Sequence, residues 1–180
     1  MYENTRGIAS RSLDKQMRTG SHVNVVKECF ARLKPDTVIE HGMGNSSTVL
    51  FHELGVHDLL SFEDDDKWKK CAANCDGSHH VIERWSLDKL QEFIDGYKNV
   101  LGFVDGIGCQ RIPTLECMLR NGIREVIEHD AESWDKDELL KRTELCKEFG
   151  YHVYQYVLEN PETALYSKEE LKLEGYIIVV

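Results

Sequence analysis

Short apolar runs alternate along the chain with longer stretches of mixed polar and apolar residues. Five of these runs are rich in Val, Ile, Leu or Phe and are too short for helices, which is typical of buried parallel strands. They lie at Thr37–Glu40, Leu59–Glu63, His80–Glu83, Val100–Asp105 and Glu125–His129. Two further strands are predicted later in the chain, at Tyr151–Leu158 and Tyr176–Val180.

Stretches with helical periodicity separate most of these strands. A leading helix is predicted at Ser21–Leu33, between a serine cap and Pro35. Five more are predicted at Ser46–Leu54, Asp65–Asn74, Ser86–Gly96, Pro113–Asn121 and Asp135–Phe149. This order of elements predicts an α/β fold: a doubly wound, mostly parallel, seven-stranded sheet with helices on both faces. The short interval between Leu158 and Tyr176 favours a hairpin-like return, which makes the last strand antiparallel.

Charge and composition narrow the classes of partner. The chain has 22 basic and 32 acidic residues and a net charge of −10, so it should repel phosphate backbones, and nucleic acid is not an expected partner. No apolar run approaches the roughly 18–20 residues that span a bilayer, so no membrane is expected either. The first residues lack the pattern of a secretory signal and the cysteines lie apart, which together predict a cytoplasmic protein.

One motif points to a ligand. The segment Glu40–Thr48 (EHGMGNSST) follows a predicted strand and opens a predicted helix. Its two glycines allow a tight turn and a close approach to a ligand, and the serines lie where free backbone N–H groups suit an anionic group. Glu63 ends the next strand about 20 residues further on, where an acid can bind both hydroxyls of a ribose. The spacing therefore predicts a nucleoside-containing ligand.

Two other interpretations of this motif stay open. A nicotinamide-dependent enzyme would be expected to have a third glycine where Ser47 stands, and it would not need Glu40 two residues before the first glycine. A serine-capped turn without any ligand is the simplest alternative.

With these motifs the chain resembles the class I (Rossmann-like) S-adenosylmethionine-dependent methyltransferases. Glu40–Thr48 resembles the first motif of that family and Ser61–Trp68 the second, while Phe103–Gly106 and Ile127–Asp130 resemble the ends of its fourth and fifth strands. The resemblance implies S-adenosylmethionine as cofactor and a single methyltransferase domain over residues 21–180. Residues 1–20 then form an N-terminal segment that could close over the site.

The resemblance also implies a set of cofactor-binding residues. Glu40, Gly42 and Gly44 would lie against the methionine part, Glu63 would bind the ribose, and Asp64, Arg84 or Trp85 would lie near the adenine. The full set is Glu40, Gly42, Gly44, Asn45, Ser46, Ser47, Glu63, Asp64, Arg84, Trp85 and Asp105.

Candidate catalytic groups lie at the ends of the fourth and fifth strands. His129 is a candidate general base because its ordinary pKa is near neutrality. Asp105 and Asp130 are candidate catalytic carboxylates and candidate ligands for Mg²⁺ or Ca²⁺, although ordinary hydrogen bonds at strand ends explain them equally well. Arg111, in the predicted loop after Gly106, is a candidate for binding an anionic acceptor.

The function expected from the sequence is methyl transfer to an oxygen or nitrogen of a small molecule. The compact chain leaves room for a partner subunit that covers the site, so a homo-oligomer is a further expectation. Two alternatives are kept: a non-catalytic module that binds S-adenosylmethionine or its by-product, and an NAD-dependent enzyme.

Overall fold

The structure, a computed structural model, describes residues 21–72, 79–131, 134–158 and 162–179. One sheet of eight strands crosses the molecule in the order β3-β2-β1-β4-β5-β7-β6-β8. The strands are β1 (Thr37–His41), β2 (Asp58–Phe62), β3 (His79–Glu83), β4 (Val100–Val104), β5 (Glu125–His129), β6 (His152–Tyr156), β7 (Thr163–Ser167) and β8 (Tyr176–Ile178). Strands β1 to β5 pair in parallel, β7 is antiparallel to β5 and β6, and β8 is antiparallel to β6.

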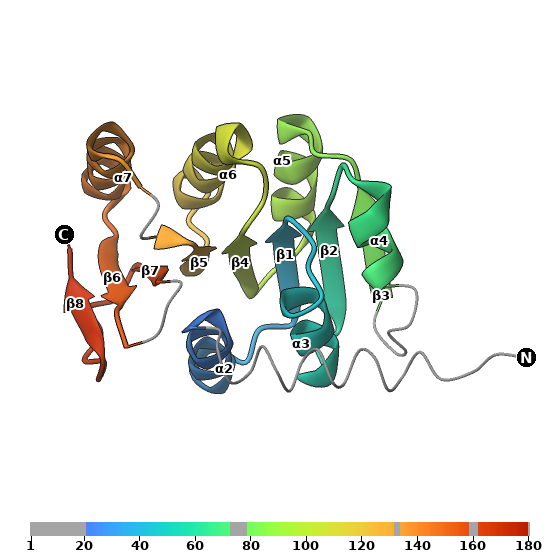
Figure 1. Cartoon of the computed structure of the whole chain (residues 1–180), viewed down its shortest axis with the longest axis horizontal. Helices are drawn as coiled ribbons and strands as arrows, with labels where there is room; N and C mark the ends of the chain where they lie inside the picture. The colour runs from blue at the N-terminus through green and yellow to red at the C-terminus, as the bar shows by residue number, and fades with distance from the viewer. Residues whose placement is uncertain (1–20, 73–78, 132–133, 159–161, 180) are drawn as a thin grey trace, which may run out of the picture.

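Helices cover both faces of the sheet (Figure 1). They are α2 (Ser21–Leu33), α3 (Ser47–Glu53), α4 (Asp66–Ala72), α5 (Leu87–Gly96), α6 (Gly108–Arg120) and α7 (Lys136–Phe149). Helices α5, α6 and α7 pack side by side on one face, while α2 and α3 pack together on the other and α4 contacts α3. The predicted doubly wound α/β fold is therefore confirmed. None of the described helices is long and apolar enough to cross a membrane.

The core has two halves because successive side chains of each strand point to opposite faces. In β1, Val38 packs in the half of the core between the sheet and helices α2 and α3. The next residue, Ile39, packs in the other half, between the sheet and helices α5, α6 and α7. The central strands are buried on both faces, as the continuous apolar runs of the sequence predict for a parallel sheet.

The sheet has one strand more than the sequence predicts. The expected hairpin-like return after β6 exists. It is formed by β7, which lies in the interval between Leu158 and Tyr176 where no strand was predicted. Strand β7 is fully buried between β5 and β6, yet its sequence is only five residues long and begins and ends with a hydroxyl residue. The final apolar run instead forms β8, an exposed edge strand beyond β6.

Helix α6 begins five residues earlier than predicted. The prediction started it at Pro113, because proline favours the first helical turn. The helix instead starts at Gly108, with a bond from Gln110 N to Ile107 O in its first turn, and it continues through the proline. The structure thus places Arg111 on a helix. The sequence prediction, which put Arg111 in a loop, was wrong on this point.

Candidate functional site

A cavity of about 600 Å³ opens at the edge of the sheet where the parallel strands end. This is the edge at which open α/β sheets bind ligands. The lining comes from the segments after β1, β2, β3 and β4, from the end of β5, and from α2, α4 and α6. It consists of His22, His41, Gly42, Met43, Gly44, Asn45, Ser46, Phe62, Glu63, Asp64, Asp65, Trp68, Trp85, Asp105, Gly106, Ile107, Gln110 and His129.

The glycine turn forms one wall of this cavity. Gly42 has a φ of +88°, and a Cβ there would lie 2.5 Å from the backbone of Asp105 and Gly106. The turn is fixed by bonds from Gly42 N to Phe62 O and from Asp105 N to His41 O. Only glycine permits this close packing of the turn against the segment after β4.

Glu63 joins the glycine turn to the segment after β2. Its carboxylate accepts hydrogen bonds from Met43 N at 3.0 Å and from Asp65 N at 2.7 Å. A carboxylate has about four acceptor positions, so two backbone donors leave it able to accept from a ligand hydroxyl. Glu63 is half-buried and lines the cavity, as its predicted role requires.

Glu40 does not line the cavity, although the sequence predicts that it lies against a ligand. Its side chain is fully buried and accepts hydrogen bonds from Ser47, Thr48 and Ser61, at distances of 2.7 to 3.0 Å. Burial raises the pKa of Glu40 to about 7, although the three hydroxyl donors oppose that shift. The carboxylate therefore ties the first turn of α3 to β1 and β2, beneath the glycine turn and outside the cavity lining.

A polar network closes the side of the cavity near β3. Asp64 accepts from Trp85 N at 3.2 Å and from Gln110 Nε2 at 3.1 Å. Gln110 also pairs with His41 Nε2 at 3.0 Å. The Trp85 indole donates to Thr114 Oγ1, which turns one ring edge toward α6. Asp64 and Trp85 thus border the cavity together.

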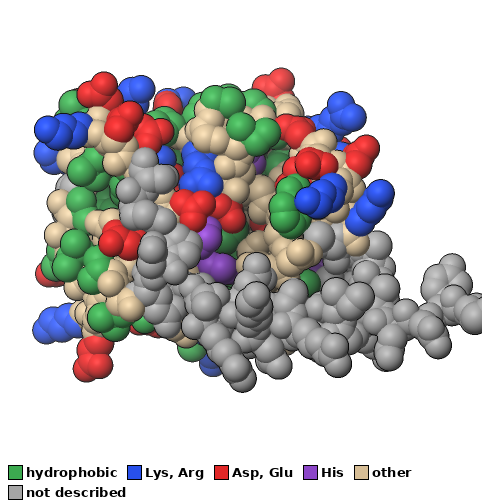
Figure 2. Space-filling model, viewed as in Figure 1, with side chains coloured by type: hydrophobic (Ala, Val, Ile, Leu, Met, Phe, Trp, Pro, Cys, Tyr) green, Lys and Arg blue, Asp and Glu red, His purple; other side chains and the backbone are tan. Residues whose placement is uncertain are grey.

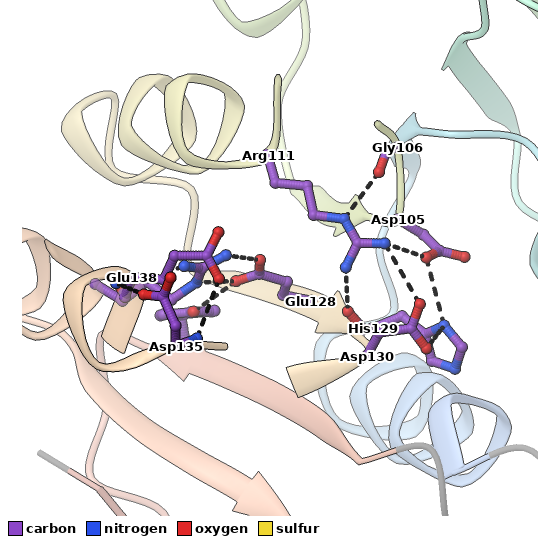
Figure 3. Close-up of polar contacts among 10 residues, drawn as sticks. Asp105, Gly106, Arg111, Glu128, His129, Asp130, Asp135 and Glu138 are labelled. Atoms are coloured by element: carbon purple, nitrogen blue, oxygen red, sulfur yellow. Dashed lines mark hydrogen bonds and ion pairs between the residues drawn. The ribbon is translucent and has the colours of Figure 1, made fainter. Parts of the chain in front are cut away.

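The guanidinium of Arg111 connects the ends of β4 and β5 (Figure 3). It donates to Gly106 O through Nε and to His129 O through one terminal nitrogen, each at 2.8 Å. Its other terminal nitrogen lies 3.0 Å from Asp105 Oδ1 and 3.4 Å from Asp130 Oδ2. Arg111 is therefore directed at protein acceptors and lies outside the cavity lining.

His129 lies in the cavity wall beside the same two carboxylates. Its Nδ1 is 3.4 Å from Asp105 Oδ1 and 3.2 Å from Asp130 Oδ1. Burial lowers the pKa of His129, but the close contact with the Asp105 carboxylate, together with the charges of Asp105 and Asp130, outweighs burial and the net direction is upward. The carboxylates would stabilise the imidazolium that forms when His129 accepts a proton.

A second imidazole, that of His22, faces the cavity from α2. Its ring packs edge-on against His129 with 4.4 Å between centroids, and its Nε2 lies 3.0 Å from Ser46 Oγ. Burial, and then the charge of His129, lower the pKa of His22 to about 4, so it is neutral near pH 7. No motif marks His22 in the sequence, because its place depends on how α2 packs across the sheet.

Asp105, His129 and Asp130 together offer the donor types of a divalent metal site. One ligand atom from each lies within 4.8 Å of the other two. Arg111, however, already places a positive charge against both carboxylates. The cluster therefore does not fit a divalent metal while Arg111 keeps this position.

The cavity is acidic. Its described lining includes the carboxylates of Glu63, Asp64, Asp65 and Asp105 and contains no Lys or Arg. Near the middle of the face shown in Figure 2, acidic side chains (red) adjoin basic side chains (blue) and histidine side chains (purple). Such a lining attracts a cationic ligand and repels a phosphate-bearing one.

The cavity brings together most of the residues predicted for the site. Those in its lining are Gly42, Gly44, Asn45, Ser46, Glu63, Asp64, Trp85, Asp105 and His129. Those outside it are Glu40, Ser47, Arg84, Arg111 and Asp130. Ser47 is buried against Glu40, and Arg84 is exposed after β3. The sequence prediction missed His22 and Gln110. Residues 1–20, expected to cover the site, lie outside the described residues.

Fold and site together define a Rossmann-like α/β domain with a ligand cavity at the glycine turn after β1. The solved structures that share this fold include the following two. One is a protein of Staphylococcus aureus provisionally assigned as a caffeoyl-CoA O-methyltransferase, with a TM-score of 0.62, 14% identity and 93% of each chain covered. The other is the methyltransferase domain of bacterial CtHen1-C, with a TM-score of 0.59, 11% identity, and 83% of this chain and 97% of that chain covered.

At these identities the likeness shows the fold alone. No protein-family profile and no curated protein sequence matches the chain.

Proposed function

We propose that the chain is an S-adenosylmethionine-dependent methyltransferase that acts on an oxygen or nitrogen of a small molecule. The observation that carries the proposal is the acidic cavity at the glycine turn, with Glu63 at its wall. When bound, S-adenosylmethionine supplies an electrophilic methyl group on a positively charged sulfonium. The carboxylates of the lining suit that charge, and Glu63 has acceptor positions left for a ribose diol.

The same cavity argues against a nicotinamide dinucleotide. The pyrophosphate of such a ligand is anionic, and the described lining offers it carboxylates but no guanidinium or ammonium group. The sheet also differs from the usual dinucleotide-binding order, because the antiparallel β7 separates β5 from β6.

His129 is the group best placed to accept a proton from an acceptor hydroxyl or amine. It lines the cavity, and the carboxylates of Asp105 and Asp130, within 3.4 Å of its Nδ1, favour its protonated form. The neighbouring His22 is neutral and can donate or accept one hydrogen bond to an acceptor. The walls of the cavity align the acceptor with the methyl group, which supplies much of the rate in a bimolecular reaction.

Calorimetric titration of the full chain with S-adenosylmethionine, S-adenosylhomocysteine and NADH tests the binding step. We expect the two adenosyl ligands to bind and NADH to fail. Glu63→Gln should weaken adenosyl binding by about ten-fold, since it removes a charged acceptor. Glu83→Gln, at the end of the neighbouring β3 and outside the cavity lining, is the matched control and should bind normally.

Transfer of a radiolabelled methyl group to a panel of phenols, carboxylic acids and amines tests the catalytic step. His129→Asn should lower turnover by about 100-fold and leave the dissociation constant of S-adenosylmethionine nearly unchanged. Binding of NADH alone would refute the proposal. Tight adenosyl binding with no transfer to any acceptor would establish the non-catalytic module instead.

A further inference from the structure

We infer that Arg111 is a built-in cation that occupies a site otherwise competent to bind a divalent metal. The site is the cluster of Asp105, His129 and Asp130 at the ends of β4 and β5 (Figure 3). The inference does not depend on methyl transfer, because it concerns which cation this cluster holds.

The donor atoms have the spacing that a metal needs. Nδ1 of His129 lies 3.4 Å from Asp105 Oδ1 and 3.2 Å from Asp130 Oδ1. Adjacent ligands of an octahedral ion with bonds of about 2.2 Å are about 3 Å apart. Two carboxylate oxygens and one imidazole nitrogen form a donor set that Mn²⁺ accepts. The side chains of Asp105 and Asp130 are partly exposed, whereas the Nδ1 atom of His129 is buried behind them.

Arg111 already provides the charge that such an ion would bring. One terminal nitrogen lies against Asp105 Oδ1, the same oxygen that faces His129, and also against Asp130 Oδ2. With the guanidinium in place, one full positive charge lies against the two carboxylates. The net negative charge left to attract a divalent cation is then half of what the two carboxylates would offer alone.

The backbone holds this guanidinium in position. Gly106 O and His129 O accept two of its hydrogen bonds, so moving it would break contacts with the ends of both strands. Arg111 starts from the first turn of α6, and its side chain is largely buried. A metal would therefore have to displace an anchored side chain, not a mobile surface arginine.

Removal of the guanidinium should turn the cluster into a metal site. We expect Arg111→Met to bind one Mn²⁺ per chain, at least about ten-fold more tightly than the wild-type chain, because a positive charge about 4 Å away is gone. Electron paramagnetic resonance of free Mn²⁺ measures this binding without any substrate. Arg120→Met, at the other end of α6 and exposed, is the matched control and should gain no site.

Asp105→Asn or Asp130→Asn in the Arg111→Met background should abolish the new site and so locate it. The inference is overturned if folded Arg111→Met gains no Mn²⁺ site. It is equally overturned if the wild-type chain binds one Mn²⁺ and Asp105→Asn removes that binding.

If Arg111→Met does not fold, the wild-type chain still decides the question. Nuclear magnetic resonance of its histidine rings, titrated with Mn²⁺, should show no selective broadening of His129. Selective broadening of His129 at submillimolar Mn²⁺ would overturn the inference. The result is independent of the proposed function, which fails or stands on adenosyl binding.

Discussion

Glu40 shows how one buried carboxylate can support a binding turn without touching the ligand. Three hydroxyl groups, from Ser47, Thr48 and Ser61, surround it, and no cation contacts it among the described residues. Hydroxyl donors compensate only part of the cost of burying the charge, because burial still raises the pKa of Glu40 to about 7. Glu40 therefore makes the stability of the site region dependent on pH.

Glu40→Gln removes this titration while keeping the shape of the side chain. In the wild-type chain the raised pKa contributes stability that is complete below the unfolded value of 4.5 and is lost as pH rises to about 7. At about 1.4 kcal/mol per pH unit, the loss is about 3 kcal/mol. Urea unfolding should therefore show that the wild-type chain loses about this much more free energy of unfolding than Glu40→Gln does when the pH rises from 5 to 8. An equal difference at both pH values would contradict the assignment.

The sequence held a signal for the orientation of Glu40 that motif reasoning does not use. Residues two apart in a strand point to the same face, so Glu40 shares a face with Val38. Val38 packs against α2 and α3, and Glu40 accordingly meets the hydroxyls of α3. The motif predicted that Glu40 lies against a ligand, but the alternation of the strand turns its side chain toward α3 instead.

The glycine turn is the element that brings β1 and β4 together at the cavity. Gly42→Ala should destabilise the fold by more than about 2 kcal/mol, since it adds a Cβ 2.5 Å from backbone atoms at a positive φ. Gly55 also has a positive φ but nothing within 4 Å, so Gly55→Ala should cost only about 1 kcal/mol. Urea unfolding measures both. Equal losses would show that space at the turn does not matter.

Helix α7 is held to the sheet by a buried ion pair. Arg142, 2% exposed, forms a bidentate pair with Glu128 of β5, and Tyr166 of β7 donates to the same carboxylate at 2.7 Å. Glu128 thus points to the α7 side, away from the cavity (Figure 3). Arg142→Met should destabilise the fold by about 3–5 kcal/mol, because it leaves a buried charge unpaired.

The double variant Glu128→Leu with Arg142→Met is the control for this prediction. It removes both charges and should recover much of the stability lost in Arg142→Met. Thermal and urea unfolding of the two variants provide the comparison. A double variant less stable than Arg142→Met would mean that the pair is not the main attachment of α7.

The elements that the sequence predicted well are those whose signals are local. Strands β1 to β5 each contain consecutive apolar residues, and α5 and α7 begin after Ser86 and Asp135, whose side chains cap them. Strand β7 and the start of α6 depend on contacts with residues outside their own segments. β7 is a strand because β5 and β6 pair with it, and α6 begins early where Arg111 contacts both strand ends. The five residues of β7, taken alone, do not show that they will pair with β5 and β6.

At the scale of the whole molecule, the net charge and the cavity lining have the same sign. The chain carries −10, and the described lining of its cavity is acidic as well. A ligand approaching the site therefore meets a field that favours cations both at a distance and in contact. The basic residues near the start of the sequence, Arg6, Arg11, Lys15 and Arg18, are too few to reverse this balance.

This balance predicts that the chain does not bind nucleic acid. Binding to a phosphate backbone gains most of its affinity from counterions released by Lys and Arg, so it is strongest at low salt. Fluorescence anisotropy of labelled single-stranded and duplex oligonucleotides at about 50 mM salt should show no binding up to about 10 μM protein, a concentration at which an ordinary non-specific nucleic-acid-binding protein binds at low salt. Saturable binding that weakens with salt would show instead that the few cations form a phosphate-binding surface, and the acceptor would then have to be sought among nucleic acids.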